Sequence, residues 1–526
     1  MLHRNGTRRA PRVAPAVAAV LALALAGCGA DGAGPRPAAT STEAAALSAD
    51  PAPVVVPGTV LGLDVEATVG PVAVDGDLAV LRVEIEATGG DAFVMVGEVF
   101  ANLALTQDDS LDGTRLVDLE DGVVREPARS ASGAALASLG EEYLLETGRE
   151  PVVGYVAFDA PDTPTTAVLV PALGLVEDVP VVAAADAGDL TVPVADLAPD
   201  GTTDVVAPTA FLETFSTSAG DAVRTRDARD LVSVAVDSDV LFAVDSADLG
   251  PEADGVLEAV AAQLALAADG DLVVVGHTDD VGEDAANQEL SERRARAVAD
   301  RLGEIADLGR FDVRVEGRGE TEPVSTEPSD EGRALNRRVT VEFTPSGEPA
   351  VVGSSDAGGA LAAEGPTVDG LGSATLDHRD GLGGTQRLEV SLVEVRRAGG
   401  YLVGTLDVRN VGPEYATFVS VLGSVRDGRG DLSAGMLGAN NVTLLDGGVR
   451  VYPVDYLVDP AVYTDQQRST LADLQLGSLE TGATARVTVV WPDTGAGTVV
   501  VDVPDGSTEV TDGSTPVRFV DVPVAD

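Results

Sequence analysis

The stretch from Val273 to Leu302 reads VVVGHTDDVGEDAANQELSERRARAVADRL. It begins inside a short apolar run, Leu272 to Val275, that stops at Gly276, a pattern typical of a buried strand. A polar turn follows, and from Asn287 onward the apolar residues recur at the period of a helix. A strand that ends in a polar turn and opens into a helix is a common way to build a ligand site.

Two side chains of opposite charge border this turn. Asp279 lies just past the strand, and Arg294 lies about two turns into the helix. If the helix packs back on the sheet, both head groups face one small cleft. There the carboxylate receives an ammonium group, and the guanidinium takes a carboxylate in a two-pronged hydrogen bond, so the pair suits a zwitterion. On spacing alone an ordinary surface ion pair is the simpler interpretation, because such pairs are common.

The segment GHTDDVGEDAANQELSERRARAV resembles the signature of the OmpA-like peptidoglycan-binding domain family. The residues in register with the family motif are Gly276, His277, Thr278, Asp279, Gly282, Asn287, Leu290, Ser291, Arg294 and Ala295. The flanking segments that also match are VLFAVDSADLGPEA from Val240, VEGRGETEPV from Val315 and GRALNRRVTVEF from Gly332. Together they cover about a fifth of the chain.

The resemblance implies non-covalent binding of peptidoglycan through the diaminopimelate of its stem peptides. In the family, the residue that matches Asp279 takes the ligand's amino group, and the one that matches Arg294 takes its carboxylate. We expect Thr278 and Asn287 to shape the pocket through the turn and the helix start. The family often has an acidic residue after Phe242, and this chain has Ala243 there.

The central domain, residues 228–345, is predicted to be α+β with the order βαβαββ. The expected strands are Leu231–Val236, Leu272–Val275, Asp312–Glu316 and Val339–Phe343, and the expected helices are Glu252–Ala267 and Asn287–Leu302. The apolar residues that repeat along these segments supply the core.

Length and charge set the outer limits. The chain has 526 residues, which predicts about three or four domains. Its net charge is -52, which argues against nucleic acid as a partner because phosphate binding needs basic surface. No Lys is present, and 10 of the 34 basic residues lie between Arg293 and Arg338. Most of these Arg side chains are expected to form helix and ladder ion pairs.

The amino terminus predicts export and a lipid anchor. Residues 1–27 combine basic residues with an apolar, Ala-rich run too short to span a membrane, as in a signal peptide. The run ends Leu25-Ala26-Gly27-Cys28, which resembles the bacterial lipobox, whose Cys is acylated. Lipid on Cys28 would hold the chain on the extracytoplasmic face of the cell membrane or the outer membrane. Residues 28–53 then read as a flexible tether.

Two segments of alternating strands flank the central domain, at residues 54–194 and 386–526. Each contains Leu-Glu-Thr-Gly followed by Pro-Asp-Thr, at Leu145 and at Leu479. We interpret them as two copies of one immunoglobulin-like β-sandwich, each able to fold alone. Residues 195–227 and the Gly/Ser/Ala-rich residues 346–385 are predicted to be linkers. The sandwiches are a possible site for a protein partner.

The residues give no support for catalysis, a metal or a cofactor. His277 is the one His outside the signal peptide and the second linker, and the single Cys is the expected lipid site. Neither a triad nor a zinc cluster can be assembled from them. The chain is therefore predicted to be a wall-binding lipoprotein and not an enzyme. The alternatives are an adhesin or scaffold acting through its sandwiches and a cell-wall hydrolase. The lone Trp491 is expected in a sandwich core and not as a sugar platform.

Overall fold

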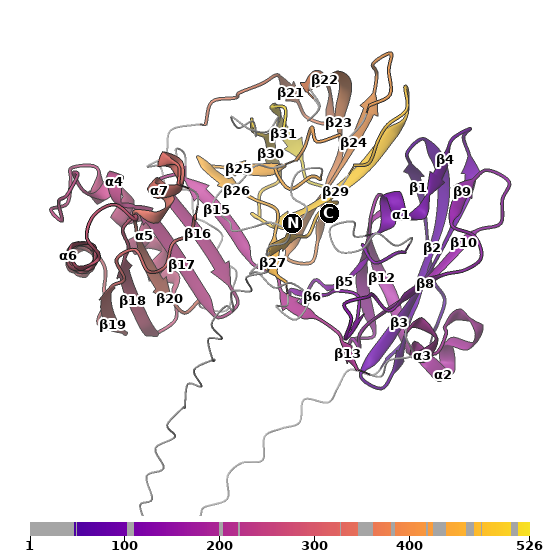
Figure 1. Ribbon diagram of the computed structural model, residues 1–526, viewed down its shortest axis with the longest axis horizontal. Helices are drawn as coiled ribbons and strands as arrows, with labels where there is room; N and C mark the ends of the chain where they lie inside the picture. Colours follow the sequence, from indigo (N-terminus) through magenta and orange to yellow (C-terminus); the bar gives the residue numbers. More distant parts are fainter. Residues whose placement is uncertain are drawn as a thin grey trace, which may run out of the picture. The chain divides into compact units, whose positions relative to one another are not determined.

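The computed structural model describes residues 47–48, 50–101, 110–198, 204–218, 221–326, 328–345, 361–379, 384–416, 419–423, 438–458, 468–474, 476–505 and 514–526 (Figure 1). Cys28, the signal peptide and most of the predicted tether lie outside the described residues. In the described part, no helix combines the length and the apolar character needed to cross a membrane.

The central domain is a four-stranded sheet in the order β19-β18-β20-β17, with helices packed on one face. Its elements are β17 (Leu231–Asp237), α4 (Ser238–Leu241), α5 (Ala253–Leu266), β18 (Gly270–Gly276), α6 (Asp284–Ile305), β19 (Phe311–Gly317), α7 (Asp330–Asn336) and β20 (Arg338–Phe343). β18 and β19 are parallel, and β20 runs antiparallel to both β18 and β17. Figure 1 shows α5 and α6 on the same side of this sheet.

Every predicted central element is present. α5 is one residue shorter than predicted at each end, and the other elements extend one to three residues beyond the prediction at one or both ends. The apolar face of α5 meets that of α6 and the strands in one buried cluster, which includes Leu257, Val298, Val274 and Val341. The short helices α4 and α7 were not predicted. Each is too brief to show a helical period, and α7 is stabilised locally by Ser329, whose hydroxyl accepts a hydrogen bond from Gly332 N at 3.0 Å.

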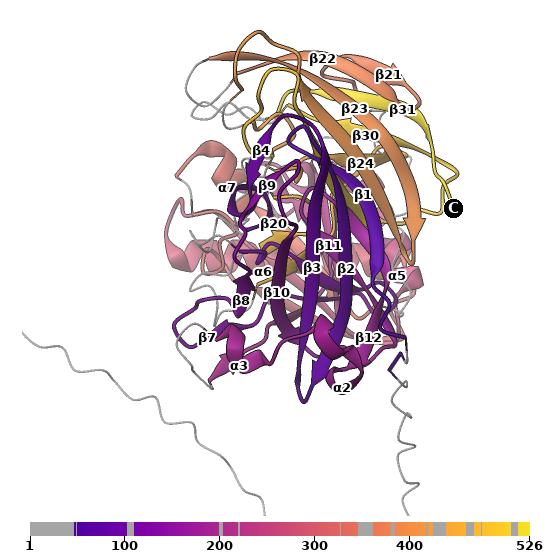
Figure 2. The same cartoon turned by 90° about the vertical axis from the view of Figure 1, so that its right-hand side faces the viewer.

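Most strands of the first flanking region form one continuous ten-stranded sheet around a main buried cluster, and this region is called the first sandwich here. Its strands are β1 (Val54–Val60), β2 (Leu63–Asp75), β3 (Leu78–Gly89), β4 (Phe93–Met95), β5 (Arg115–Asp118), β6 (Val123–Arg125), β7 (Arg129–Ser130), β8 (Ala137–Leu139), β9 (Leu144–Glu146), β10 (Val152–Asp159), β11 (Thr165–Val170), β12 (Gly174–Ala183), β13 (Val205–Val206) and β14 (Thr209–Phe211). Short helical turns are α1 (Val96–Phe100), α2 (Ala184–Ala187), η1 (Gly188–Leu190) and α3 (Val194–Leu197). Figure 2 shows β1, β2 and β3 side by side.

The second flanking region, the second sandwich, repeats this plan. Its strands are β21 (Thr367–Asp369), β22 (Gly372–Arg379), β23 (Thr385–Ala398), β24 (Tyr401–Asn410), β25 (Thr443–Asp446), β26 (Val449–Val451), β27 (Asp455–Leu457), β28 (Arg468–Thr470), β29 (Thr484–Pro492), β30 (Thr498–Val503) and β31 (Val517–Pro523). The order β1-β2-β3-β10 corresponds to β22-β23-β24-β29, and β6-β5-β11-β12 corresponds to β26-β25-β30-β31. Equal strand order supports the duplication, and the immunoglobulin-like assignment remains a prediction. Trp491 is fully buried in this core and donates to Val442 O at 2.8 Å.

The two predicted linkers need correction. Residues 195–227 include the end of α3, β13, β14, β15 (Thr214–Ser218) and most of β16 (Val223–Ala228). The predicted second linker contains β21 and β22, and its His378 is buried in the second sandwich, 1% exposed. The first segment is rich in Asp and Thr and the second in Gly, Ser and Ala, and neither composition reveals that β13, β14, β15 and β21 pair with strands distant in sequence. Residues 346–360 and 380–383 lie outside the described part.

Candidate functional site

Close contact between the end of β18 and α6 positions the site. A Cβ on Gly276 would lie 2.1 Å from Ser291 O, and one on Gly317 would lie 2.5 Å from Glu292 N. Only glycine permits backbones to approach this closely. The two glycines therefore let α6 pack against the ends of β18 and β19, which brings the middle of α6 next to the turn that follows Gly276.

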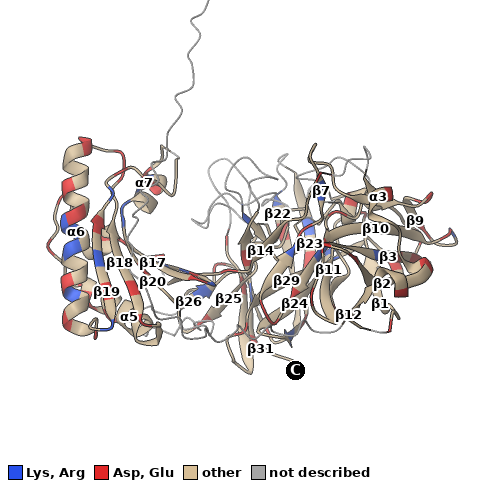
Figure 3. Ribbon diagram, turned by 90° about the horizontal axis from the view of Figure 1, so that it is seen from below, with Lys and Arg blue, Asp and Glu red and all other residues tan. Residues whose placement is uncertain are grey.

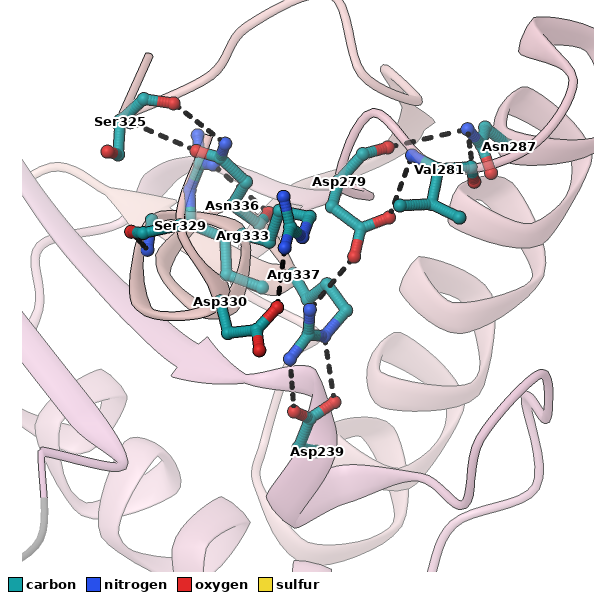
Figure 4. A network of polar contacts seen from close by, with 12 residues as sticks. Asp239, Asp279, Val281, Asn287, Ser325, Ser329, Asp330, Arg333, Asn336 and Arg337 are labelled. Carbon is teal, nitrogen blue, oxygen red and sulfur yellow. Dashed lines mark hydrogen bonds and ion pairs between the residues drawn. The ribbon is translucent and has the colours of Figure 1, made fainter. Parts of the chain in front are cut away.

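Asp279 in this turn is held by a guanidinium that the sequence analysis did not single out. Its Oδ2 accepts from Arg337 Nη1 at 2.8 Å, and its Oδ1 accepts from Val281 N at 3.2 Å. Arg337 also donates to both carboxylate oxygens of Asp239, at 2.7 and 3.1 Å. Figure 4 shows Arg337 lying between the two carboxylates. These hydrogen bonds raise the pKa of Arg337, and those to Asp239 lower the pKa of that carboxyl.

Asn287, near the start of α6, stabilises the turn that contains Asp279 through side-chain hydrogen bonds. Its Nδ2 donates to Glu320 Oε2 at 2.8 Å and makes longer contacts with the carbonyls of Val281 and Asp279, at 3.3 and 3.4 Å. The neighbouring Thr278 is 5% exposed, and its amide donates to Gly319 O at 2.9 Å. Both residues lie next to Asp279, and the Asn287 side chain and the Thr278 amide connect the turn to the loop after β19.

Arg294 is buried deeper than the predicted cleft implied. It is 5% exposed, its Nε donates to Ser246 O at 3.0 Å, and its guanidinium carbon lies 5.2 Å from the centre of the Phe242 ring. It forms no ion pair with any residue that the structure describes. Burial lowers its pKa, while Asp239, Asp245 and Asp279 act in the opposite direction. Arg294 and Asp279 thus lie in one electrostatic environment without bonding to each other.

The surface ion pair that spacing alone allowed is not what forms. Asp279 pairs with Arg337, and Arg294 lies behind the Phe242–Ser246 loop. Arg337 and Asp239 complete the cluster. Arg337 lies in GRALNRRVTVEF, a segment already matched to the family, where the concentration of Arg between Arg293 and Arg338 was the available signal, whereas Asp239 lies one residue before the matched segment that begins at Val240. Figure 3 shows both acidic and basic residues along α6, and among them Arg294 is buried.

His277 should make the central domain sensitive to acid. It is 3% exposed, and burial, with Arg338 and Arg318 adding to the effect, lowers its pKa from 6.5 to about 3. Below pH 6.5 the unfolded chain binds a proton that the folded chain rejects, so stability falls as the pH drops towards 3. The full effect is about 4–5 kcal/mol.

His277→Gln removes this proton uptake. The unfolding free energy of each protein is measured with urea at several pH values. As the pH falls from about 7 to about 4, the wild type should lose more unfolding free energy than the variant. Carboxyl groups titrate equally in both proteins and cancel in that difference. A difference that stays flat over this range would show that His277 is not held neutral by the fold.

Comparison with known proteins identifies the domain that carries this site. The model of the OmpA family matches residues 241–337, which contain Asp279, Arg294 and Arg337. The putative lipoprotein YfiB of Escherichia coli K12 is 34% identical over 130 residues, and the match covers 25% of this chain and 75% of YfiB. The chain belongs to the OmpA family.

Two further matches cover a similar share of this chain. Outer membrane protein A of Bordetella avium is 37% identical over 114 residues, which cover 22% of this chain and 58% of that protein. Among solved structures, the cell wall anchor of the T6SS from Pseudomonas aeruginosa is 39% identical, covers 24% of this chain and 90% of that one, and has a TM-score of 0.22. The sandwiches lie outside the OmpA family match.

Proposed function

We propose that this protein is a cell-envelope anchor that binds peptidoglycan non-covalently, with Asp279 and Arg294 holding the diaminopimelate of a stem peptide. The observation that carries the proposal is the state of Arg294. Its guanidinium is buried, stacked on Phe242 and bonded only to a backbone carbonyl among the described residues. A buried charge without a paired counter-ion is costly, so a ligand carboxylate that pairs with it is favoured.

Asp279 suits the other end of the same ligand. The group formed by Asp239, Arg337 and Asp279 has two carboxylates for one guanidinium, which leaves a surplus negative charge beside Arg294. An ammonium group next to Asp279 and a carboxylate on Arg294 match this charge pattern. Together with Arg294, these three side chains carry no net charge. The zwitterionic end of a diamino acid is also neutral. Thr278 and Asn287 support the turn that presents Asp279.

Binding is better supported than catalysis. The relatives' printed names describe a lipoprotein and outer membrane proteins, not enzymes. Among the described residues no group of three His, Cys, Asp or Glu side chains is placed to hold a metal ion. A wall hydrolase or an adhesin acting through the sandwiches remains an outcome that the binding test below would reveal.

A wall pull-down tests the proposal on the whole extracytoplasmic chain. Asp279→Asn should lose most of its binding to purified peptidoglycan, because the ligand ammonium loses its carboxylate. The matched control is Asp280→Asn, which changes the exposed neighbour by the same atoms and should bind like the wild type. Equal retention of all three proteins would move the binding function away from this site and towards the sandwiches.

Anchoring is proposed to depend on Cys28, the last residue of Leu25-Ala26-Gly27-Cys28. Cys28→Ala should leave the protein without lipid, either in the soluble extracytoplasmic fraction or as uncleaved precursor. Mass spectrometry of the mature amino terminus is the measurement. An unmodified Cys28, or a mature chain that begins elsewhere, would refute the lipid anchor.

A further inference from the structure

The sheet of the OmpA family domain does not end at β17. β16 pairs with β17, β15 pairs with β16, and β15 also pairs with β26 of the second sandwich through Ser216↔Val451, Thr217↔Arg450 and Ser218↔Val449. One sheet of eleven strands therefore runs from β19 to β21. A backbone ladder of this kind fixes the register of the strands that it joins.

A buried ion cluster reinforces the joint. Asp455 of β27 is 0% exposed, and its Oδ1 accepts from Arg226 Nη1 and from Arg468 Nη2, both at 2.8 Å. Glu213 accepts from the same two guanidinium groups. Burial alone would raise the pKa of Asp455, but the two Arg side chains outweigh it and lower that pKa. The two carboxylates and two guanidinium groups carry no net charge together. Glu213 comes from the connecting segment, residues 209–218, Arg226 comes from β16, and Asp455 and Arg468 come from the second sandwich.

The backbone and two aromatic rings add contacts at the same place. Glu213 and Asp455 exchange backbone hydrogen bonds, at 2.7 and 3.0 Å, and Tyr452 N donates to Phe215 O at 3.0 Å. The rings of Phe215 and Tyr452 lie 5.4 Å apart, and the Arg226 guanidinium lies 5.0 Å from the centre of the Phe215 ring. Paired rings and a cation over a ring each favour this geometry.

The connecting segment adds one edge strand to each of the two sandwiches. β14 adds an edge strand to β6 of the first sandwich through Thr209↔Arg125, Ala210↔Val124 and Phe211↔Val123. Two residues later, β15 adds an edge strand to β26, the counterpart of β6 in the second copy. Residues 209–218 thus complete one sheet in each copy, and β15 at the same time continues the sheet of the central domain.

We infer that residues 209–218 act as a double donor strand that locks the OmpA family domain to the second sandwich as one rigid body. The domain is then not a module that swivels on a slack connection. Its orientation is set by the β15–β26 ladder and by the cluster of Glu213, Arg226, Asp455 and Arg468. The surface along β15 and β16 is an interface whose partner is the second sandwich of the same chain.

Distance measurement between two spin labels tests this in the otherwise complete chain. Cys28 is replaced by Ser, and labels are placed on Glu289→Cys in α6 and Thr375→Cys in β22, two exposed positions. A rigid joint predicts a single narrow distance distribution. A broad distribution in this parent protein would overturn the inference, whatever the variants do.

Two variants weaken the joint by independent routes. Asp455→Ala removes the buried carboxylate that Arg226 and Arg468 share and leaves them Glu213, and Thr217→Pro removes a backbone N–H from β15 where it pairs with β26. Each should broaden the distribution. Asp330→Ala, which removes an exposed carboxylate paired with Arg333, is the control and should leave it narrow. A distribution that stays narrow in both joint variants would show that other contacts fix the domain.

Discussion

Arg294→Ala is expected to weaken binding of a diaminopimelate-containing stem peptide about 30-fold or more. Removing one member of a buried charge pair costs on the order of 2–5 kcal/mol. Arg294 is 5% exposed and forms no ion pair with the described residues. The ligand carboxylate is therefore its proposed counter-ion, and the substitution removes that pair. Titration calorimetry on the complete extracytoplasmic chain is the measurement.

The controls separate binding from folding. Arg293→Ala removes the adjacent Arg of α6, which is exposed and paired only with Glu289 among the described residues, and it should bind normally. Arg294→Lys keeps the charge but not the two-pronged hydrogen bond, so its affinity should fall between those of the wild type and Arg294→Ala. Arg310→Ala, outside the motif, should also bind normally.

Asp279→Ala should cause a loss similar to that of Arg294→Ala. The double variant should lose less than the sum of the two, since both side chains hold one ligand. Equal affinity of the wild type, Asp279→Ala and Arg294→Ala would remove the proposed site despite the family membership.

The first sandwich is expected not to stay monomeric by itself. Val117, Leu169 and Leu175 of this sandwich lie in one buried cluster with Val403, Val454, Leu471 and Val490 of the second. Full burial of one such side chain is worth roughly 1.5–3 kcal/mol. Three of them together approach the total stability of a domain, about 5–15 kcal/mol.

Polar contacts make separation more costly still. Arg115 Nε donates to Tyr456 Oη at 2.7 Å, and Tyr456 Oη donates to Glu126 Oε1 at 2.8 Å. All three side chains are buried, and they come from both sandwiches. Separation would break the Arg115–Tyr456 and Tyr456–Glu126 hydrogen bonds. The expectation from sequence, that each copy folds alone, is therefore replaced by the prediction that they fold together.

Light scattering of a fragment covering residues 45–212 tests this prediction. The fragment should self-associate through its exposed apolar face. Leu169→Glu should make the fragment more monomeric, and the same change should destabilise the complete chain, where Leu169 is 1% exposed. A monomeric, cooperatively folded fragment without the substitution would refute the shared core.

The central strands and helices were predictable because each carries its own period. The apolar run from Leu272 to Val275 indicates a strand, and the repeat of Leu290, Ala297, Val298 and Ile305 indicates a helix. The sequence motif located Gly276 and Gly317. The structure explains why glycine is needed there, because neither position has space for a side chain. Strands β13, β14 and β15 were missed because their order comes from pairing with β7, β6 and β26, far away in sequence.

By itself the sequence determined the family of the central domain, its element order and the residues Asp279, Arg294, Thr278 and Asn287 as candidates, because local period and motif spacing carry that information. Only the tertiary structure decided which charges meet. Asp279 pairs with Arg337, 58 positions away, and Asp455 binds Arg226, 229 positions away. Such pairs follow from how strands and helices pack in space, and spacing along the chain sets no limit on which side chains that packing brings together.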